Sequence, residues 1–247
     1  MMGSGIAYAS ILQGLEVLLI DQNIESAEAG KTKIEMLLNE SVKRKKLSEE
    51  EKIRLLGKVK TVSSLEKISS SDLVIEAVFE DLKLKQNLYK KIEPHLKDSA
   101  ILASNTSTLP ITKLAEILKD STRFIGIHFF SPVDKMNLVE LIKSEKTNDI
   151  ALAVALDYTS LIKKTPIVVN DSRGFYANRC IIPYINEGLR MLSEGIEPAL
   201  VENAAKQIGM PVGPLQLLDE LSVSLALNVA RETKEALGTK YEETGTE

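Results

Sequence analysis

The sequence predicts an α/β fold in which a doubly wound, mostly parallel sheet is followed by an all-α domain. Two observations lead to this fold class. Up to about residue 170, short apolar runs alternate with charged segments of helical length, which is typical of parallel strands covered by helices. From Gly174 onward the patterns are helical, at about 175–193, 198–208 and 215–237. We therefore expect two domains, at residues 1–171 and 172–247.

The composition is that of a globular protein and excludes several kinds of site. The 247 residues are 44% hydrophobic and 27% charged, so the chain can bury a core and is not disordered. The net charge of −4 gives no general attraction to nucleic acid, and no apolar run has the length of a membrane span. One cysteine and two histidines exclude an internal disulfide and a His- or Cys-rich metal site. The chain opens in a helical pattern without a secretory signal, which predicts a cytoplasmic location.

The first residues have the pattern of the second half of a Rossmann-type dinucleotide-binding unit. Gly3 and Gly5 precede an apolar helical stretch at 6–12, and a β-type run at 16–20 leads to Asp21. A carboxylate there accepts the ribose hydroxyls of NAD and repels the 2′-phosphate of NADP, so Asp21 predicts NAD. The strand and the glycines that should precede Gly3 are missing, so we expect an N-terminally truncated domain that binds NAD poorly.

A charged helical stretch follows at 25–57 and contains the basic run Lys43, Arg44, Lys45 and Lys46. Ser48 and Glu51 have the spacing of a capping box, which predicts that a new helix begins after the run. Two interpretations of the basic run stay open. It is either a solvated helix end, where cations are favoured by the helix dipole, or a clamp for a phosphorylated substrate.

Polar side chains follow two of the predicted buried strands. The strand at 72–78 leads to Glu80, which we expect to open a helix that carries Lys85. The strand at 100–103 leads into residues 104–108, which include Asn105 and Ser107. The carboxyl ends of parallel strands are where open α/β sheets bind ligands, although a simple turn and helix cap would also explain the small polar residues.

His128 and Glu140 are the candidate acid–base pair. Each is a polar residue within an apolar strand pattern, at 123–130 and 136–142. A buried unpaired carboxylate is costly, so Glu140 needs a partner, and the short connection allows the two strands to pair. A carboxylate on one imidazole nitrogen makes the other nitrogen a better base. The second histidine, His95, is expected to be an ordinary surface residue at the end of a helix.

These motifs together resemble the (S)-3-hydroxyacyl-CoA dehydrogenases of fatty-acid β-oxidation, and most closely the dehydrogenase half of the bacterial multifunctional proteins. The motifs are MGSGIA at 2–7, IEAVFE at 75–80, SNTS at 104–107, HFFSP at 128–132, LVE at 138–140, GFYANR at 174–179 and GMPVGP at 209–214. The resemblance implies oxidation of a 3-hydroxyacyl-CoA to a 3-oxoacyl-CoA with NAD. It also implies that a further helical segment after residue 241 is absent, so that the chain is a fragment or a mis-started gene product.

The resemblance assigns catalytic roles to four residues. His128 would be the general base that takes the proton of the 3-hydroxyl group, and Glu140 would orient it. Ser107 and Asn178 would hydrogen-bond the reacting oxygen and so hold it near the imidazole.

The resemblance also assigns binding residues. The positions that match cofactor contacts are Gly3, Asp21, Glu80, Lys85 and Asn105. The run from Lys43 to Lys46 falls on the helix that gives basic contacts to the phosphates of CoA. Family members commonly dimerise through the helical domain, so we expect a homodimer or membership of a multifunctional β-oxidation complex.

Two other functions stay open at this point. The first is a related dehydrogenase that acts on short 3-hydroxybutyryl-CoA or on a hydroxy acid without CoA. The second is an inactive truncated module that serves only in binding or oligomerisation. The sequence does not indicate the length of the acyl chain.

Overall fold

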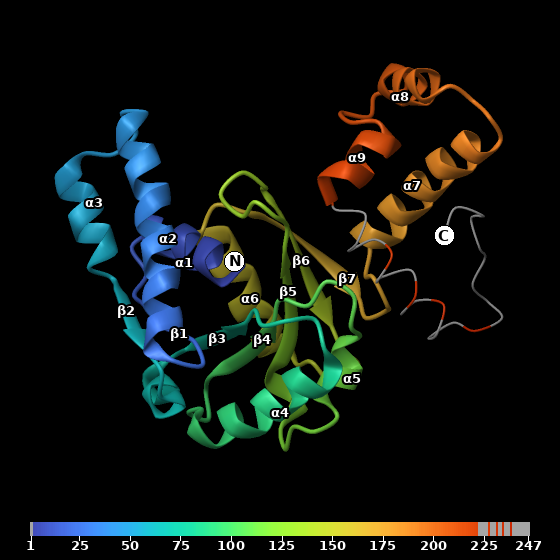
Figure 1. Cartoon of the computed structure of the whole chain (residues 1–247). Coiled ribbons are helices and arrows are strands. Elements are labelled where there is room, and N and C mark those ends of the chain that lie inside the picture. Colours follow the sequence, from blue (N-terminus) through green and yellow to red (C-terminus); the bar gives the residue numbers. More distant parts are fainter. Residues whose placement is uncertain (1, 222–226, 228–230, 232–233, 235–237, 239–247) are drawn as a thin grey trace. The chain divides into compact units, whose positions relative to one another are not determined.

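Seven strands alternate with helices in the first part of the chain (Figure 1). The computed structural model describes residues 2–221 and residues 227, 231, 234 and 238. It divides into two compact units, Met1–Tyr176 and Ala177–Glu247. The first unit contains α1 (Met2–Leu12), β1 (Val17–Ile20), α2 (Ile24–Lys43), α3 (Glu49–Leu56), β2 (Val59–Val62), η1 (Leu65–Ser70), β3 (Leu73–Glu76), α4 (Leu82–Ile92), η2 (Glu93–His95), β4 (Ile101–Ser104), α5 (Ile111–Ala115), η3 (Ser121–Arg123), β5 (Phe124–Phe129), β6 (Leu138–Lys143), α6 (Asp149–Leu161) and β7 (Thr165–Asn170).

The strands form two sheets among the described residues. β1 pairs with β2, and the other five have the order β3-β4-β5-β6-β7. Every neighbouring pair is parallel except β5 and β6, which are antiparallel. The predicted class, a mostly parallel sheet with helices and a helical domain after it, is therefore confirmed.

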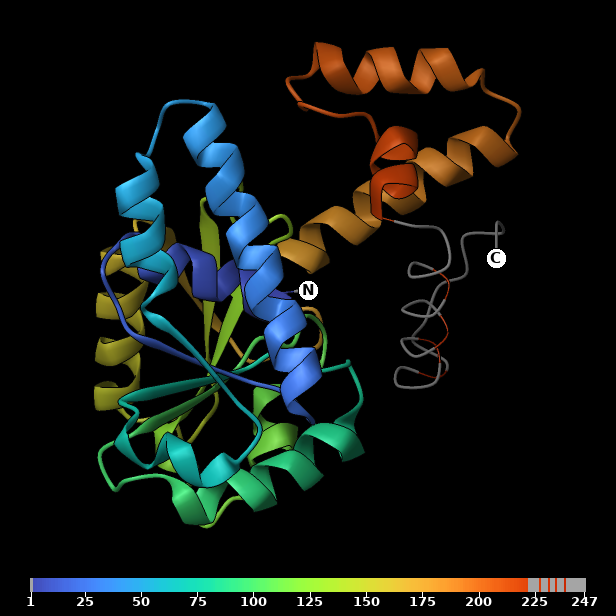
Figure 2. The ribbon, with the colours of Figure 1, turned by 60° about the vertical axis from the view of Figure 1, so that its left-hand side comes forward.

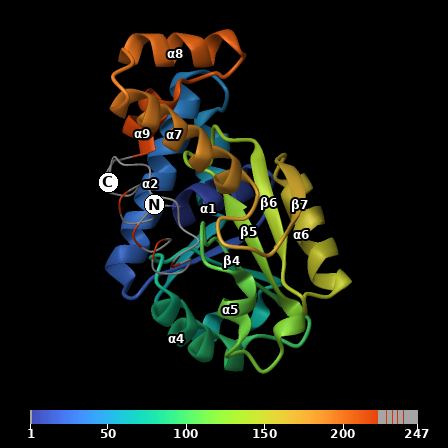
Figure 3. The same cartoon turned by 90° about the vertical axis from the view of Figure 1, so that its right-hand side faces the viewer.

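Helices cover both faces of the five-stranded sheet, as the apolar strands require (Figure 3). On one face, α1 and α6 pack against a cluster that includes Ile101, Ile125 and Leu141. On the other face, α4 and α5 pack against a cluster that includes Leu102 and Phe124. Alternate residues of each strand thus reach opposite layers. A third cluster joins α1, α2 and α3 to β1 and β2, and Figure 2 shows α2 and α3 side by side.

The predicted helical stretch at 25–57 is two helices with a sharp break between them. α2 ends at Lys43, and Lys45 takes a left-handed φ of 57°, which is common just after a helix. Ser48 then opens α3 with the capping box that the sequence predicts, because its side chain accepts from the Glu51 N–H and the Glu51 carboxylate accepts from the Ser48 N–H. The basic run is therefore held on an ordered turn.

Gly126 allows α5 to approach β5 closely. A Cβ atom at this position would lie 2.8 Å from the Ile111 Cδ1 atom and 2.9 Å from the Ile142 Cβ atom. Only glycine leaves room for this contact. The approach brings the start of α5, at Ile111, against β5 at Gly126.

The second unit is helical in its described residues. It contains α7 (Ala177–Ser193), α8 (Pro198–Gln207) and α9 (Pro214–Leu221). The Glu202 carboxylate accepts from the N–H groups of Leu215 and Gln216 at the start of α9. Most of the rest of the helix predicted at 215–237 lies outside the described residues. No helix in the described part of the chain combines the length and apolar character needed to cross a membrane.

Candidate active site

His128 and Glu140 face each other on neighbouring antiparallel strands. They are directly opposite in the register of β5 and β6, and the His128 Nδ1 atom lies 2.7 Å from the Glu140 Oε2 atom. Both are buried, with 4% and 0% of their surface exposed. A carboxylate can only accept here, so the proton of a neutral ring lies on Nδ1 and leaves Nε2 free of a proton. This is the arrangement of a general base.

Backbone and ring contacts fix the pair on either side. The other oxygen of Glu140, Oε1, accepts from the Tyr176 N–H at 3.0 Å. The His128 ring lies against the rings of Phe130 and Phe175, with centroids 4.6 and 5.9 Å away. The carboxylate is thus held at both oxygens, and the imidazole lies among aromatic rings.

The loop after β4 reaches the same end of β5. Asn105 is buried at the end of β4, and its Oδ1 atom accepts from the N–H of Phe129, the neighbour of His128. Ser107 lies two residues further along this loop and is half-buried. The structure therefore ties the polar residues predicted at 104–108 to the strand that carries the candidate base.

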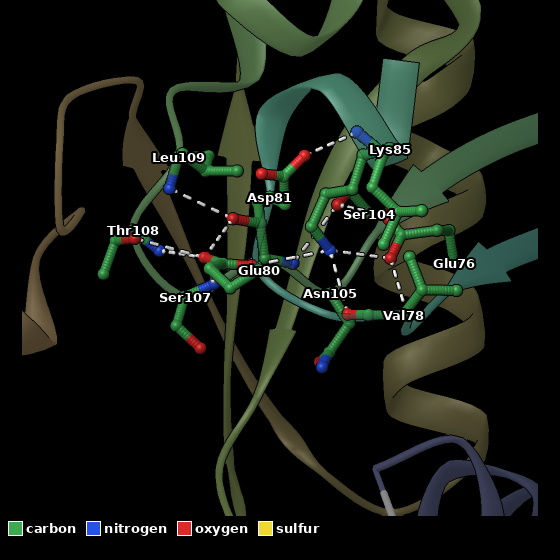
Figure 4. A network of polar contacts seen from close by, with 12 residues as sticks. Glu76, Val78, Glu80, Asp81, Lys85, Ser104, Asn105, Ser107, Thr108 and Leu109 are labelled. Atoms are coloured by element: carbon green, nitrogen blue, oxygen red, sulfur yellow. Dashed lines mark hydrogen bonds and ion pairs between the residues drawn. The ribbon is translucent and has the colours of Figure 1, made fainter. Parts of the chain in front are cut away.

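Glu80 holds this loop in place (Figure 4). One of its oxygens, Oε1, accepts from the Thr106 hydroxyl and from the N–H groups of Ser107 and Thr108. Burial raises the pKa of Glu80, but the Thr106 hydroxyl, the Lys85 ammonium and the two N–H groups outweigh it, so the pKa is lowered overall. The expectation that Glu80 opens a helix is wrong, because α4 begins at Leu82 with Asp81 as its N-cap. Glu80 instead turns toward the loop after β4.

Lys85 lies inside a buried polar cluster that sequence reasoning missed (Figure 4). Its Nζ atom lies 2.7 Å from the Glu76 carboxylate and 3.4 Å from that of Glu80. Glu76 also accepts from the Tyr89 hydroxyl at 2.6 Å and from the Ser104 hydroxyl at 2.8 Å. Burial raises the pKa of Tyr89, and the neighbouring Glu76 carboxylate raises it further. The signal in the sequence was a lone carboxylate in an apolar strand, which is the same signal that identified Glu140.

The two residues predicted at the start of the cofactor site lie at the ends of α1 and β1. Gly3 is in the first turn of α1, where a Cβ atom would meet only the Ala77 Cβ atom, at 4.0 Å. Asp21 directly follows β1, is exposed, and accepts from the Gln22 N–H at 2.8 Å. An open glycine at a helix N-terminus and an exposed carboxylate after the next strand fit a dinucleotide.

Part of the basic run lines a hollow beside α2. Lys43, Arg44, Lys45 and Lys46 are all exposed, and two of them, Arg44 and Lys46, border this hollow of about 370 Å³. Its other lining residues are Tyr8, Leu12, Leu37, Glu40, Ser41, Leu47, Asp134 and Lys135. Two basic side chains of the run therefore share one surface with Lys135.

The two remaining predicted residues are Asn178 and His95. Asn178 is in the first turn of α7 and belongs to the second unit. His95 ends the short η2 turn and is partly exposed. Within the described ranges, no three His, Cys, Asp or Glu side chains gather as a metal site requires.

Comparison with known protein families matches both parts of the chain. The family described as the 3-hydroxyacyl-CoA dehydrogenase NAD-binding domain matches residues 1–172, and the C-terminal domain of the same family matches residues 174–246. The chain belongs to the 3-hydroxyacyl-CoA dehydrogenase family. Its first unit is therefore a family NAD-binding domain, as the sequence resemblance predicts.

Individual relatives agree with this family. The fatty acid oxidation complex subunit alpha of Pseudomonas putida is 37% identical over 222 residues, which are 90% of this chain and 31% of that protein. A solved (S)-3-hydroxybutyryl-CoA dehydrogenase from Ralstonia eutropha is 36% identical, with a TM-score of 0.93 over 98% of this chain and 87% of that one. A 3-hydroxybutyryl-CoA dehydrogenase from Escherichia coli is 32% identical, with a TM-score of 0.91 over 96% of this chain and 50% of that one. The chain thus spans about a third of the curated relatives that it matches.

Proposed function

We propose that this chain oxidises (S)-3-hydroxyacyl-CoA to 3-oxoacyl-CoA with NAD, as a step of fatty-acid β-oxidation. The observation that carries the proposal is the buried contact between His128 and Glu140, 2.7 Å long, at the end of the sheet where the loop of Asn105 and Ser107 is anchored. The class of substrate, a 3-hydroxyacyl-CoA, is proposed because the chain belongs to the 3-hydroxyacyl-CoA dehydrogenase family.

The chain's own residues handle the proton of the reaction. His128 takes the 3-hydroxyl proton on Nε2, and the positive charge that forms on the ring is stabilised by the Glu140 carboxylate at Nδ1. Ser107 and Asn178 hydrogen-bond the oxygen that becomes a carbonyl. NAD, when bound, would accept the hydride that leaves the carbon bearing this oxygen.

The residues for the cofactor are those near the carboxyl ends of β1, β3 and β4. Asp21 would bind the adenosine ribose, and Gly3 would allow the pyrophosphate to approach α1. Asn105, Glu80 and Lys85 would shape the nicotinamide side, the last two through the hydrogen bonds and ion pairs described above. Thermal unfolding with and without NAD tests this set, because a competent site raises the midpoint as the NAD concentration rises. A midpoint that stays unchanged as the NAD concentration rises would contradict the proposed cofactor residues.

The basic hollow is proposed as the site for the phosphates of CoA. Arg44, Lys46 and Lys135 supply the positive charge. The carboxylates of Glu40 and Asp134 line the same hollow and weaken its attraction for phosphate. The double variant R44Q/K46Q should raise KM for the CoA substrate at least fivefold and leave kcat within twofold. It should leave KM unchanged for the corresponding pantetheine thioester, which lacks the nucleotide phosphates. An equal rise for both thioesters would contradict the assignment.

The direct test is NADH formation from (S)-3-hydroxyacyl-CoA by the purified chain. We expect His128→Ala to abolish the activity and His95→Ala, the matching change at the other histidine, to leave it within twofold. Activity that survives in the His128 variant would remove the proposed base. A wild-type chain that forms no NADH would favour the alternative of a binding or oligomerisation module.

A second substrate range has its own support. Solved dehydrogenases of 3-hydroxybutyryl-CoA superpose on this chain with TM-scores above 0.9. A series of thioesters from four to sixteen acyl carbons, together with free 3-hydroxybutyrate, distinguishes the two ranges. Activity confined to the four-carbon thioester would assign the chain to short substrates, and activity on the free acid would remove the role of CoA.

The chain is further proposed to work as a homodimer or within a β-oxidation complex. The support is the name of its curated relatives, which are subunits of a fatty acid oxidation complex. The mass of the purified chain in solution tests the dimer. A monomer at micromolar concentration that turns over substrate would contradict it.

A further inference from the structure

A strained turn lies between β7 and the start of α7. Phe175 has a left-handed φ of 51°, which is a rare conformation for a bulky residue. Two other non-glycine residues in the described part of the chain have a positive φ, Lys45 and Lys163. Each of these follows the end of a helix, where a left-handed residue commonly terminates the helix. Phe175 precedes its helix instead, so helix termination does not explain it.

The surroundings of Phe175 show what maintains the strained conformation. Its side chain is 2% exposed and belongs to the cluster between the sheet and α5. Its ring centroid lies 5.9 Å from that of His128. Burial of a phenylalanine against a well-packed sheet supplies the free energy that keeps an unfavourable backbone in place.

The backbone of residues 174–176, here called the 174–176 turn, hydrogen-bonds both to the loop after β4 and to the Glu140 carboxylate. The Gly174 N–H donates to the Thr108 carbonyl at 3.3 Å, next to Ser107. The Tyr176 N–H donates to the Glu140 Oε1 atom at 3.0 Å. One short turn therefore contacts the loop after β4 and the carboxylate of the pair.

The left-handed conformation is what aims the second of these bonds. The φ and ψ angles of Phe175 set the orientation of the peptide unit that follows, and this unit contains the Tyr176 N–H. An ordinary negative φ at Phe175 would rotate that N–H away from Glu140. The strained conformation therefore fixes the Tyr176 N–H as a donor to Glu140 Oε1, while Oε2 faces His128.

We propose that Phe175 is a positioning residue for the candidate base. Its ring confines the imidazole of His128, and its backbone directs the Tyr176 N–H that fixes the Glu140 carboxylate. The catalytic part of this inference rests on the proposed dehydrogenase function, while the positioning of the imidazole can be measured without substrate.

Two pairs of variants separate positioning from general damage. Phe175→Ala removes the ring, and Ile53→Ala truncates a large apolar side chain that is 68% exposed and lies outside the described sites. Tyr176→Pro removes the backbone N–H group of residue 176. Tyr176→Ala, its control, truncates the exposed side chain and keeps the N–H group. We expect Phe175→Ala and Tyr176→Pro to lower kcat at least tenfold, with KM for NAD and thioester changed less than threefold. Both control variants should stay within twofold of wild type.

Imidazole resonances in nuclear magnetic resonance spectra give the readout that a merely structural role would not change. The chain has two histidines, so the ring signals of His128 and His95 can be assigned and compared. We expect the His128 signals to move in Phe175→Ala and Tyr176→Pro, with His95 unchanged. If Phe175→Ala does not fold, the pair at Tyr176 still decides.

Two results would overturn the proposal. One is a kcat within threefold of wild type in both test variants. The other is a set of His128 signals that stays at its wild-type position in both. A wild-type chain without dehydrogenase activity would refute the proposed function, and the spectra would still decide whether Phe175 positions the imidazole.

Discussion

Replacement of Glu140 by glutamine removes the negative charge beside His128 and keeps the shape of the side chain. The contact is 2.7 Å between Nδ1 and Oε2, so the centres of the two charges in the reacting state lie roughly 4 Å apart. At that separation, an effective dielectric constant of about 20 gives an attraction of about 4 kcal/mol. Since about 1.4 kcal/mol corresponds to a tenfold change in rate, we expect kcat to fall about 10³-fold.

The assay is steady-state NADH formation with saturating NAD and thioester. KM for both should change little, because Glu140 is fully buried and acts through His128 rather than on a ligand. Glu145→Gln is the matched control, since it makes the same change at an exposed glutamate just beyond β6. A Glu140→Gln variant that keeps a third or more of the wild-type kcat would refute the charge argument.

Three further predictions concern cofactor choice, pH dependence and packing. Asp21→Ser should raise kcat/KM for NADP relative to NAD at least tenfold, because the carboxylate no longer repels a 2′-phosphate; an unchanged ratio in NADH and NADPH assays would exclude this role. Burial raises the pKa of Tyr158 to about 12, whereas the pKa in the unfolded chain is near 10. The contribution of the neutral Tyr158 side chain to the free energy of unfolding is therefore complete below about pH 10 and is lost as the pH rises toward 12. Urea unfolding between about pH 9 and about pH 11 should show that the free energy of unfolding falls by about 1 kcal/mol less in Tyr158→Phe than in wild type. Gly126→Ala should destabilise the fold by about 1–3 kcal/mol through overpacking, whereas Gly57→Ala, which has no contact closer than 3.4 Å, should change the midpoint little.

The fold and the candidate pair could be predicted because both depend on local patterns. Apolar runs between charged helical segments give the parallel sheet, and Ser48 with Glu51 marks the start of α3 through bonds made within four residues. The need of a buried carboxylate for a partner predicts that Glu140 meets His128, and the structure has them in contact. Their roles in catalysis stay predictions.

The buried cluster around Glu76 was not predicted, although the same reasoning applies to it. Glu76 is also a lone carboxylate in an apolar strand, but its partners Lys85, Tyr89 and Ser104 come from a helix and from another strand. Lysines and tyrosines on a helix are usually exposed, so their spacing alone does not show that they turn inward. Only the packing of α4 on the sheet brings them to the carboxylate.

The 174–176 turn was beyond prediction for a different reason. A left-handed phenylalanine contradicts local preference, and no sequence pattern indicates it. It exists because tertiary packing of the ring overrides the backbone. Such conflicts between local preference and the global fold are expected where a site is assembled.

The antiparallel register of β5 and β6 has a consequence for how the protein can change. Opposite positions on the two strands bring His128 and Glu140 together, so the segment at 131–137, which follows the Phe130 ring that packs on His128, does not set their register. Insertions, deletions or grafted sequences in that segment can vary what the neighbouring surface accepts while the proton-transfer pair keeps its geometry. One residue inserted inside either strand would instead send one of the two side chains to the opposite face, where α6 packs. Evolution and laboratory redesign therefore share one rule here, which is to vary the connection and preserve the strands.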